Sequence, residues 1–235
     1  VGYSALASNV SGANNTAVGK FALVFNTASN NTAVGYQSLY ANTTGSLNVA
    51  IGGVNPGFSS TLASNTTGGQ NVAVGMSALS ANTTASYNTA IGDGALRSNT
   101  TGAENSAVGE ATLVTNSTGS YNVAVGRRAL LNNTTASNNT AVGHQSLYAN
   151  TTGTRNVAVG LNALDSNTSG VDNIGIGANA GAGLTTGSYN TAIGTAALLS
   201  TTTGVNNIAI GEQSLRNNTA SNNTAVGYEA GYNTT

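Results

Sequence analysis

Residues 139–155 read Asn139-Thr-Ala-Val-Gly-His-Gln-Ser-Leu-Tyr-Ala-Asn-Thr-Thr-Gly-Thr-Arg155, and variants of this motif fill the chain from end to end. Most copies are 17 residues apart, two steps are 16, and one step, from Gly52 to Gly75, is 23. A short period over a whole chain predicts a solenoid, in which each repeat contacts its neighbours. The glycine that follows Ala-Val or Ala-Ile marks each copy, at Gly19, Gly35, Gly52, Gly75, Gly92, Gly109, Gly126, Gly143, Gly160, Gly177, Gly194, Gly211 and Gly227.

Composition narrows the classes of function. The 235 residues include one Pro and no Cys, 6% are charged, and the net charge is −1. This balance does not indicate a nucleic-acid partner or an anionic membrane surface. The sequence lacks an apolar run near the ~20 residues that span a bilayer, so we expect no membrane insertion. We expect one repetitive domain over residues 1–235, a fragment of a longer protein because the sequence starts and stops inside a repeat.

The punctuation of each repeat predicts strands. Gly and the Asn-Thr-Thr-Gly cluster recur too often for helices of ordinary length. Between them lie segments rich in β-branched residues, such as Asn122–Gly126, which predict strands of about five residues. We therefore expect an all-β fold, a parallel β-roll or β-solenoid of about fourteen 17-residue coils stacked ~4.8 Å apart. The longer step from Gly52 to Gly75 predicts a loop insertion near residues 53–58, around Pro56.

The repeats align with one another when the repeat glycine is numbered 0. All thirteen charged residues then fall in the columns +1, +2, +5 and +12. Charged side chains are rarely buried unpaired, so these columns are predicted to face water. The nine tyrosines occupy three of the same columns, where they either form a recognition surface or simply fill an outer strand face. The candidate recognition residues are Tyr36, Tyr40, Tyr87, Tyr121, Tyr148 and Tyr189.

Two adjacent columns are apolar throughout. Position −2 is Ala in every complete repeat except at Gly175, and position −1 is always Val or Ile. Neighbouring residues of a strand point to opposite faces, so both faces are predicted to be covered. One face would line the lumen of the coil, and the other would meet a partner chain. The −1 ladder begins with Val18, Val34, Ile51, Val74 and Ile91.

Two columns of asparagine recur at −4 and +7. Asn accepts left-handed turn conformations and caps backbone groups, and in register it stacks into amide ladders. We expect a structural role for these residues. The central members of the −4 ladder are Asn88, Asn105, Asn122, Asn139 and Asn156.

The repeats Asn31–Gly45 and Asn139–Gly153 share the pattern Asn-Thr-Ala-Val-Gly-x-Gln-Ser-Leu-Tyr-Ala-Asn-Thr-Thr-Gly. This pattern resembles the head repeats of trimeric autotransporter adhesins and the related repetitive regions of bacterial and phage tail-fibre-like proteins. The resemblance covers the whole chain, although adhesin head repeats are usually shorter than this coil. It implies a parallel β-roll, a homotrimer, and an extracellular, cell-surface or virion location.

Chemical sites are not indicated by the sequence. His144 lies at +1 among surface-type residues, which favours a surface role over a catalytic base. The segment Gly175–Ala180 matches a dinucleotide fingerprint only because Gly177 is the repeat glycine, and the βαβ context is missing. The carboxylates are scattered over outer columns, unlike the clustered ligands of a metal site. We therefore expect no catalytic, cofactor-binding or metal-binding residue, and no enzymatic activity.

Our first hypothesis is a non-enzymatic fibre segment, the shaft or head of a surface adhesin or phage-type tail fibre. Its partners would be further copies of itself, as a homotrimer or a filament, and a host-surface receptor or glycan. One alternative is a self-assembling extracellular filament subunit. Another is an ice-binding solenoid, suggested by the columns of paired threonines.

Overall fold

The computed structural model describes residues 1–53 and 59–233, and it confirms an all-β parallel β-solenoid. The chain divides into two compact units, Val1–Ser120 and Tyr121–Thr235. The described residues contain no helix. In the first unit the strands are β1 (Thr16–Val18), β2 (Thr32–Val34), β3 (Val49–Ile51), β4 (Val72–Val74), β5 (Thr89–Ile91) and β6 (Ser106–Val108). In the second they are β7 (Val123–Val125), β8 (Thr140–Val142), β9 (Val157–Val159), β10 (Ile174–Ile176), β11 (Thr191–Ile193), β12 (Ile208–Ile210) and β13 (Thr224–Val226).

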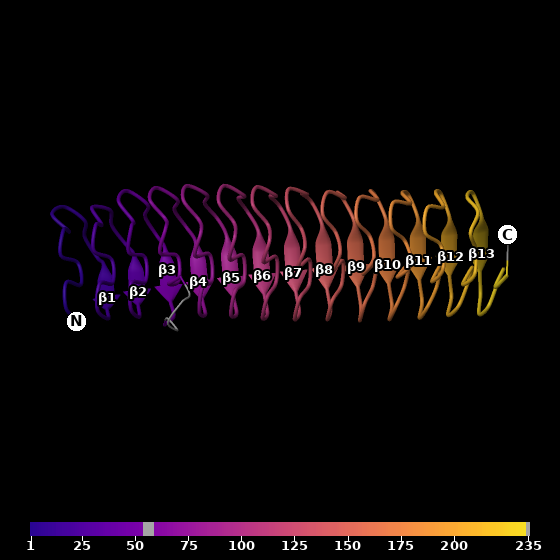
Figure 1. The fold of residues 1–235 in the computed structure, drawn as a ribbon, viewed down its shortest axis with the longest axis horizontal. Coiled ribbons are helices and arrows are strands. Elements are labelled where there is room, and N and C mark those ends of the chain that lie inside the picture. The colour runs from indigo at the N-terminus through magenta and orange to yellow at the C-terminus, as the bar shows by residue number, and fades with distance from the viewer. Residues whose placement is uncertain (54–58, 234–235) are drawn as a thin grey trace. The chain divides into compact units, whose positions relative to one another are not determined.

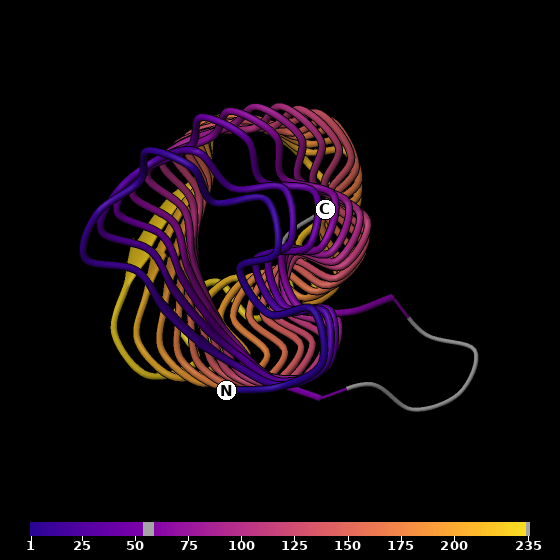
Figure 2. The same cartoon turned by 90° about the vertical axis from the view of Figure 1, so that its left-hand side faces the viewer.

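Within each unit the strands pair in chain order, parallel and in register (Figure 1). In the first unit Ala17 pairs with Ala33, and Val18 with Val34. Each strand belongs to one coil, and turns form the rest of the coil (Figure 2). Equivalent residues of successive coils therefore lie side by side, about 4.8 Å apart.

Each strand has three residues rather than the five predicted, because the flanking Asn and Gly are engaged differently. The Asn139 backbone N–H donates to the side chain of Asn122 at 3.0 Å, not to a backbone carbonyl. At the other end Gly160 has a φ of +134°. A Cβ at Gly160 would lie 2.6 Å from the Gly177 carbonyl oxygen, so only glycine lets the next coil approach.

Backbone pairing continues through the turns. The N–H of Leu147 donates to the Ala163 carbonyl at 2.9 Å, and that of Ala149 donates to the Asp165 carbonyl at 2.8 Å. The turn has an unusual backbone, since Leu147 has a φ of +50°. Equivalent leucines in other coils share this left-handed conformation, which ordinarily disfavours residues with a Cβ. Packing and coil-to-coil hydrogen bonds must offset that cost in each coil that has leucine at this position.

Leucine and alanine fill the lumen. The +4 leucines from Leu23 to Leu113 in the first unit are fully buried, as are Leu130, Leu147, Leu164 and Leu198 in the second. The −2 alanines point inward as well, and Ala33 and Ala158 are 0% exposed.

The described residues leave the outer face of the strands partly exposed. The −1 residues Val18, Ile51 and Ile91 of the first unit are 45%, 40% and 40% exposed. In the second unit Ile176 and Ile210 are 39% and 37% exposed. Alanine therefore lines the lumen, and the Val/Ile column faces outward. Residues 1–53 and 59–233 do not provide the predicted second layer over that column.

The long step between Gly52 and Gly75 keeps the coil intact. Thr61 takes the +3 position, and its hydroxyl donates to the Gly75 carbonyl at 2.7 Å. Leu62 takes the buried +4 position. The loop insertion predicted near residues 53–58, around Pro56, falls on residues 54–58, which lie outside the described part of the chain.

Candidate functional site

The charged side chains project outward, as predicted from their columns. All thirteen lie in the described part of the chain, and none is buried. Nine are exposed and four are half-buried. The half-buried ones are Arg128, Asp165, Asp172 and Arg216.

One outer column contains a bidentate ion pair. The Arg155 Nε and Nη2 atoms donate to the two carboxylate oxygens of Asp172, each at 2.7 Å. The hydrogen bond from Arg155 lowers the pKa of Asp172, and the same hydrogen bond raises the pKa of Arg155. Both groups are solvated, so the pair contributes little to stability.

Two other groups titrate away from their ordinary values. Partial burial raises the pKa of Asp165, and hydrogen bonds from Ser166 oppose that shift. A hydrogen bond to Glu229 raises the pKa of the Tyr228 phenol. These groups lie in different coils and do not converge with a nucleophile.

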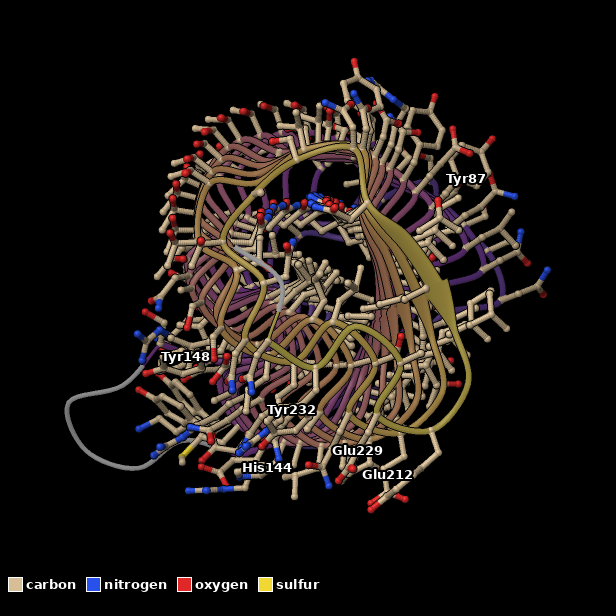
Figure 3. All side chains as sticks on the ribbon, turned by 90° about the vertical axis from the view of Figure 1, so that its right-hand side faces the viewer. Tyr87, His144, Tyr148, Glu212, Glu229 and Tyr232 are labelled. Atoms are coloured by element: carbon tan, nitrogen blue, oxygen red, sulfur yellow. The ribbon has the colours of Figure 1, made fainter. Side chains whose placement is uncertain are left out.

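The six candidate tyrosines occupy different corners of the coil and do not form one site. Tyr148, in the +5 column of the second unit, is half-buried on the same outer side as His144 and Tyr232 (Figure 3). Tyr121 and Tyr189, in the +12 column, are 56% and 59% exposed. Tyr87 projects outward from the +12 column of the first unit (Figure 3). With Glu104 it lines an open depression.

Tyr36 and Tyr40 alone join a larger group. The Phe21 ring lies edge-to-face with Tyr36 at 6.2 Å and with Tyr40 at 6.5 Å between centroids. Phe21 also contacts Tyr3 at 5.6 Å, and Phe25 contacts Tyr40 at 5.1 Å. We name this group with Lys20 the aromatic patch: Tyr3, Lys20, Phe21, Phe25, Tyr36 and Tyr40.

Sequence reasoning missed four members of the aromatic patch. Phe21 and Phe25 lie at +2 and +6, outside the tyrosine columns, and Tyr3 and Lys20 were not chosen as candidates. The signal that could have identified these residues is that their columns are neighbours on the surface of the coil. Once coils are stacked in register, positions +1, +2, +5 and +6 of neighbouring coils share one surface.

The asparagine columns lie inside the coil, where nitrogen and oxygen atoms stack in rows (Figure 3). In the −4 column the Asn105 N–H donates to the Asn88 Oδ1 at 3.0 Å, and that of Asn156 to the Asn139 Oδ1 at 2.9 Å. Their Nδ2 groups close the coil, as Asn139 does by donating to the Gly153 carbonyl at 2.9 Å. Asn122 is equally buried, and its Nδ2 donates to the Ala136 carbonyl. Such fully buried amides are occupied in holding the fold.

Nothing in the geometry assembles a catalytic or metal centre from the described residues. His144 is exposed in its +1 column. In the described part of the chain there is no group of three His, Cys, Asp or Glu that could hold a metal ion. Residues 1–53 and 59–233 also contain no helix long and apolar enough to cross a membrane.

Known proteins give no further guidance. Comparisons with protein families, with curated proteins and with solved structures found no match for this chain. The outer face of the strands and the aromatic patch are thus the two candidate interaction surfaces.

Proposed function

We propose that the chain is a non-enzymatic segment of an extracellular fibre, the shaft or head of an adhesin or tail fibre, and that it assembles as a homotrimer. The observation that carries this proposal is the aliphatic outer face of the strands. Its −1 column is Val or Ile in all thirteen strands, and seven of these residues are exposed by 37–45%. The resemblance of the repeat to adhesin and tail-fibre repeats suggests the number of copies.

The composition of this face is unlike that of a free surface. The thirteen charged residues avoid positions −1 and −3, although both point away from the lumen. Position −3 is Thr, Val, Ser or Ile throughout. Four solvent-facing columns elsewhere on the coil, +1, +2, +5 and +12, accept Lys, Asp, Glu or Arg, whereas the exposed +9 column also carries no charge; the −1 column differs from it in being Val or Ile. Exclusion of charge from two outward columns is expected where a second apolar surface covers them.

The size of the face suits an interface. Two outward columns span about 10 Å along the strand and about 4.8 Å per coil, so six strands present about 290 Å² and seven about 340 Å². An area of this size approaches that of the largest apolar patch on a typical soluble monomer, about 300–600 Å², and such patches are often functional. A trimer of such coil stacks would act as a rigid spacer that holds a binding surface away from its anchor.

Light scattering after size exclusion tests the proposal. We expect a particle of three times the 23.0 kDa chain mass. Ile176→Lys places a charge on the proposed interface and should shift the mass towards one chain. Leu161→Lys is the matched control, because Leu161 is an outward aliphatic residue of the same unit, 50% exposed, in the +1 column. A monomeric parent chain, or equal effects of both substitutions, would reject the trimer; long polymers would favour the filament.

Ice binding is a second candidate, favoured by one observation about the same face. Threonines Thr16, Thr32 and Thr89 of the first unit lie in the −3 column, one residue from an aliphatic −1 neighbour across the alanine. In-register parallel strands repeat the methyl groups of this column from Thr16 to Thr89, and Thr16 and Thr32 place their hydroxyl groups side by side, although Val49 and Val72 separate that pair from Thr89. A monomer that shows thermal hysteresis, lost on Thr89→Lys, would select this candidate over the fibre.

A further inference from the structure

The aromatic patch gathers side chains from three successive coils on the outside of the first unit. Tyr3, Phe21 and Tyr36 form a row with ring centroids 5.6 and 6.2 Å apart. Tyr40 and Phe25 extend the row sideways at 6.5 and 5.1 Å. The contacts are edge-to-face, with interplanar angles of 70–81°, which is a favoured arrangement for aromatic pairs.

Closure of the coil does not require these rings. The lumen of the same coils is filled by Leu23 and Leu39, both 0% exposed. Other coils carry Asp93, Glu110 or Arg127 at the +1 position that Tyr36 occupies. The rings are therefore additions to the outer surface rather than parts of the core.

Much of the patch is open to solvent. Phe25 is 45% and Tyr36 is 40% exposed. Exposed clusters of large apolar side chains mark binding surfaces, and tyrosine offers rigid contact area with a polar edge.

The patch also carries a positive charge. The Lys20 ammonium lies 5.1 Å from the Phe21 ring centroid and 5.9 Å from that of Tyr3, within cation–π range. Lys20 is the only charged side chain among residues 1–53. The ammonium thus has no carboxylate partner in the coils that build the patch, and its remaining N–H donors are available to an anion.

We propose that the aromatic patch binds an acidic saccharide chain, one whose sugar units carry carboxylates. Aromatic faces pack against the apolar C–H faces of sugar rings, while phenol hydroxyls accept and donate hydrogen bonds at the edges. The Lys20 ammonium pairs with a saccharide carboxylate by a charge-assisted hydrogen bond. The row of rings along successive coils suits an extended chain. This inference rests on the proposed function, since it gives the fibre a partner, but it concerns a different surface from the trimer interface.

Titration followed by NMR tests the inference on the full chain. The probes are short oligomers of galacturonate, of sialic acid and of hyaluronan, with methyl-esterified oligogalacturonate as the neutral counterpart. We expect at least one acidic oligomer to shift the ring signals of Tyr36 and Phe21 and to bind more tightly than the neutral one. Absence of binding by all three acidic oligomers overturns the proposal, as does equal binding of the neutral form.

Substitutions locate the site. Phe21→Ala and Tyr36→Ala should each weaken binding by about tenfold. Lys20→Gln should remove the preference for the acidic over the esterified oligomer while leaving ring contacts in place. Tyr189→Ala is the matched control, because Tyr189 is 59% exposed in the second unit and belongs to none of the ring contacts of the patch. Unchanged affinity of the Phe21→Ala and Tyr36→Ala variants overturns the site.

The mass measurement separates the two proposals. A trimer that binds none of the oligomers leaves the fibre proposal standing and removes the patch. A monomer that binds acidic oligomers through Tyr36 keeps the patch and removes the trimer. Recruitment of a further copy of this chain by the patch would appear as a mass change on Tyr36→Ala, and that result also overturns saccharide binding.

Discussion

The coil from Gly143 to Val159 and the coil from Gly177 to Ile193 fill the same lumen with different residues. The first has the usual Leu147 at +4 and Asn150 at +7. The second has Gly181 at +4 and Leu184 at +7, and both are buried. A Cβ at Gly181 would lie 3.1 Å from Leu184 Cδ1 and 2.7 Å from Leu164 Cδ2. The leucine has changed its position in the sequence, but it fills the same space.

The replacement of asparagine by leucine at +7 interrupts a ladder of hydrogen-bonded amides. Asn150 Nδ2 donates to Asn133 Oδ1 at 2.9 Å, and Asn167 Nδ2 to Asn150 Oδ1 at 3.0 Å. The next +7 residue is Leu184, which has no amide, and the buried Asn167 Oδ1 accepts no hydrogen bond from any described residue. A buried acceptor without a donor costs about 1–3 kcal/mol. The comparison teaches that the lumen must keep its volume, while the ladder tolerates a gap.

The largest effect is expected when the Gly at +4 and the Leu at +7 are transferred into the coil from Gly143 to Val159, here called the regular coil. Leu147→Gly alone leaves a cavity and should cost about 4 kcal/mol of unfolding free energy. Asn150→Leu alone overfills the lumen and interrupts the ladder, at about 3 kcal/mol. Because the new leucine can occupy the vacated space, the double variant should cost about 2 kcal/mol less than the sum. Urea unfolding followed by circular dichroism measures the cycle, and strict additivity would refute volume compensation.

A smaller effect on the free energy of unfolding is expected when Leu at +4 and Asn at +7 are restored in the coil from Gly177 to Ile193, here called the irregular coil. Gly181→Leu alone forces a second leucine against Leu164 and Leu184 and should cost about 3 kcal/mol. Adding Leu184→Asn removes the clash and gives Asn167 Oδ1 a donor, so the double variant should unfold within about 1 kcal/mol of the parent. Thermal melts of the three variants measure this. If the double variant were as unstable as Gly181→Leu, the backbone of the irregular coil would differ in conformation from that of the regular coil.

Much of the fold follows from the sequence, because the 17-residue period and the polarity of each column determine the structure within one repeat. A fixed repeat glycine and outward charges were enough to predict parallel coils and their solvent-facing columns. The inward face of the strand was not predictable, since Ala and Val are both apolar. That choice depends on space in the lumen, where a Cβ at Gly175 would lie 2.7 Å from Leu164 Cγ. That coil lacks room even for the Cβ of alanine, and in the other coils alanines such as Ala158 are already 0% exposed, so the lumen does not accommodate a larger valine.

The left-handed leucines and the aromatic patch were not predictable for different reasons. Nothing in the identity of Leu147 suggests a φ of +50°, because that conformation is imposed by hydrogen bonds to the neighbouring coils. The patch depends on which columns become neighbours in space. Phe21 and Tyr36 are fifteen residues apart in sequence, and only the stacking register brings their rings together.

Turn strain offers a finer test of the comparison, because it concerns the outer backbone rather than the lumen. Gln145, at +2 of the regular coil, has a φ of +55°, whereas Asn162 and Asn179 occupy that position in later coils. Asn accepts this conformation more readily, so Gln145→Asn should stabilise the chain by about 0.5 kcal/mol. His144→Asn, one residue earlier, is the control and should change stability less. The urea midpoint measures both, and a loss of stability in Gln145→Asn would contradict the strain argument.

Titration of outer carboxylates should give the smallest effects. The Asp172 pKa lies below its usual 3.8, so the ion pair stabilises the fold above pH 3.8, and that contribution is lost as pH falls through the folded pKa. The Asp165 pKa lies above 3.8 because burial disfavours the charged carboxylate. The fold therefore gains stability as pH falls through the raised pKa of the folded state towards 3.8. Carboxyl NMR titration should show the two shifts with opposite sign. Arg155→Gln should return Asp172 towards 3.8 and leave Asp165 unchanged; a shift of both would show that the outer columns are coupled.

The buried +7 asparagines also bear on how the protein can be made. Asn42, Asn82 and Asn150 each begin an Asn-Thr-Thr triplet, which fits the acceptor signal for N-linked glycosylation. In the folded chain the Asn42 Nδ2 donates to Asn26 Oδ1 at 2.7 Å and to the Gly45 carbonyl at 2.8 Å. An oligosaccharide on that nitrogen would replace one of its two hydrogen atoms, which removes one of these hydrogen bonds, and it would have to pass through the wall of the coil. Synthesis in a eukaryotic secretory pathway would attach sugars before the coils close, so such a host should yield chains that cannot complete the fold.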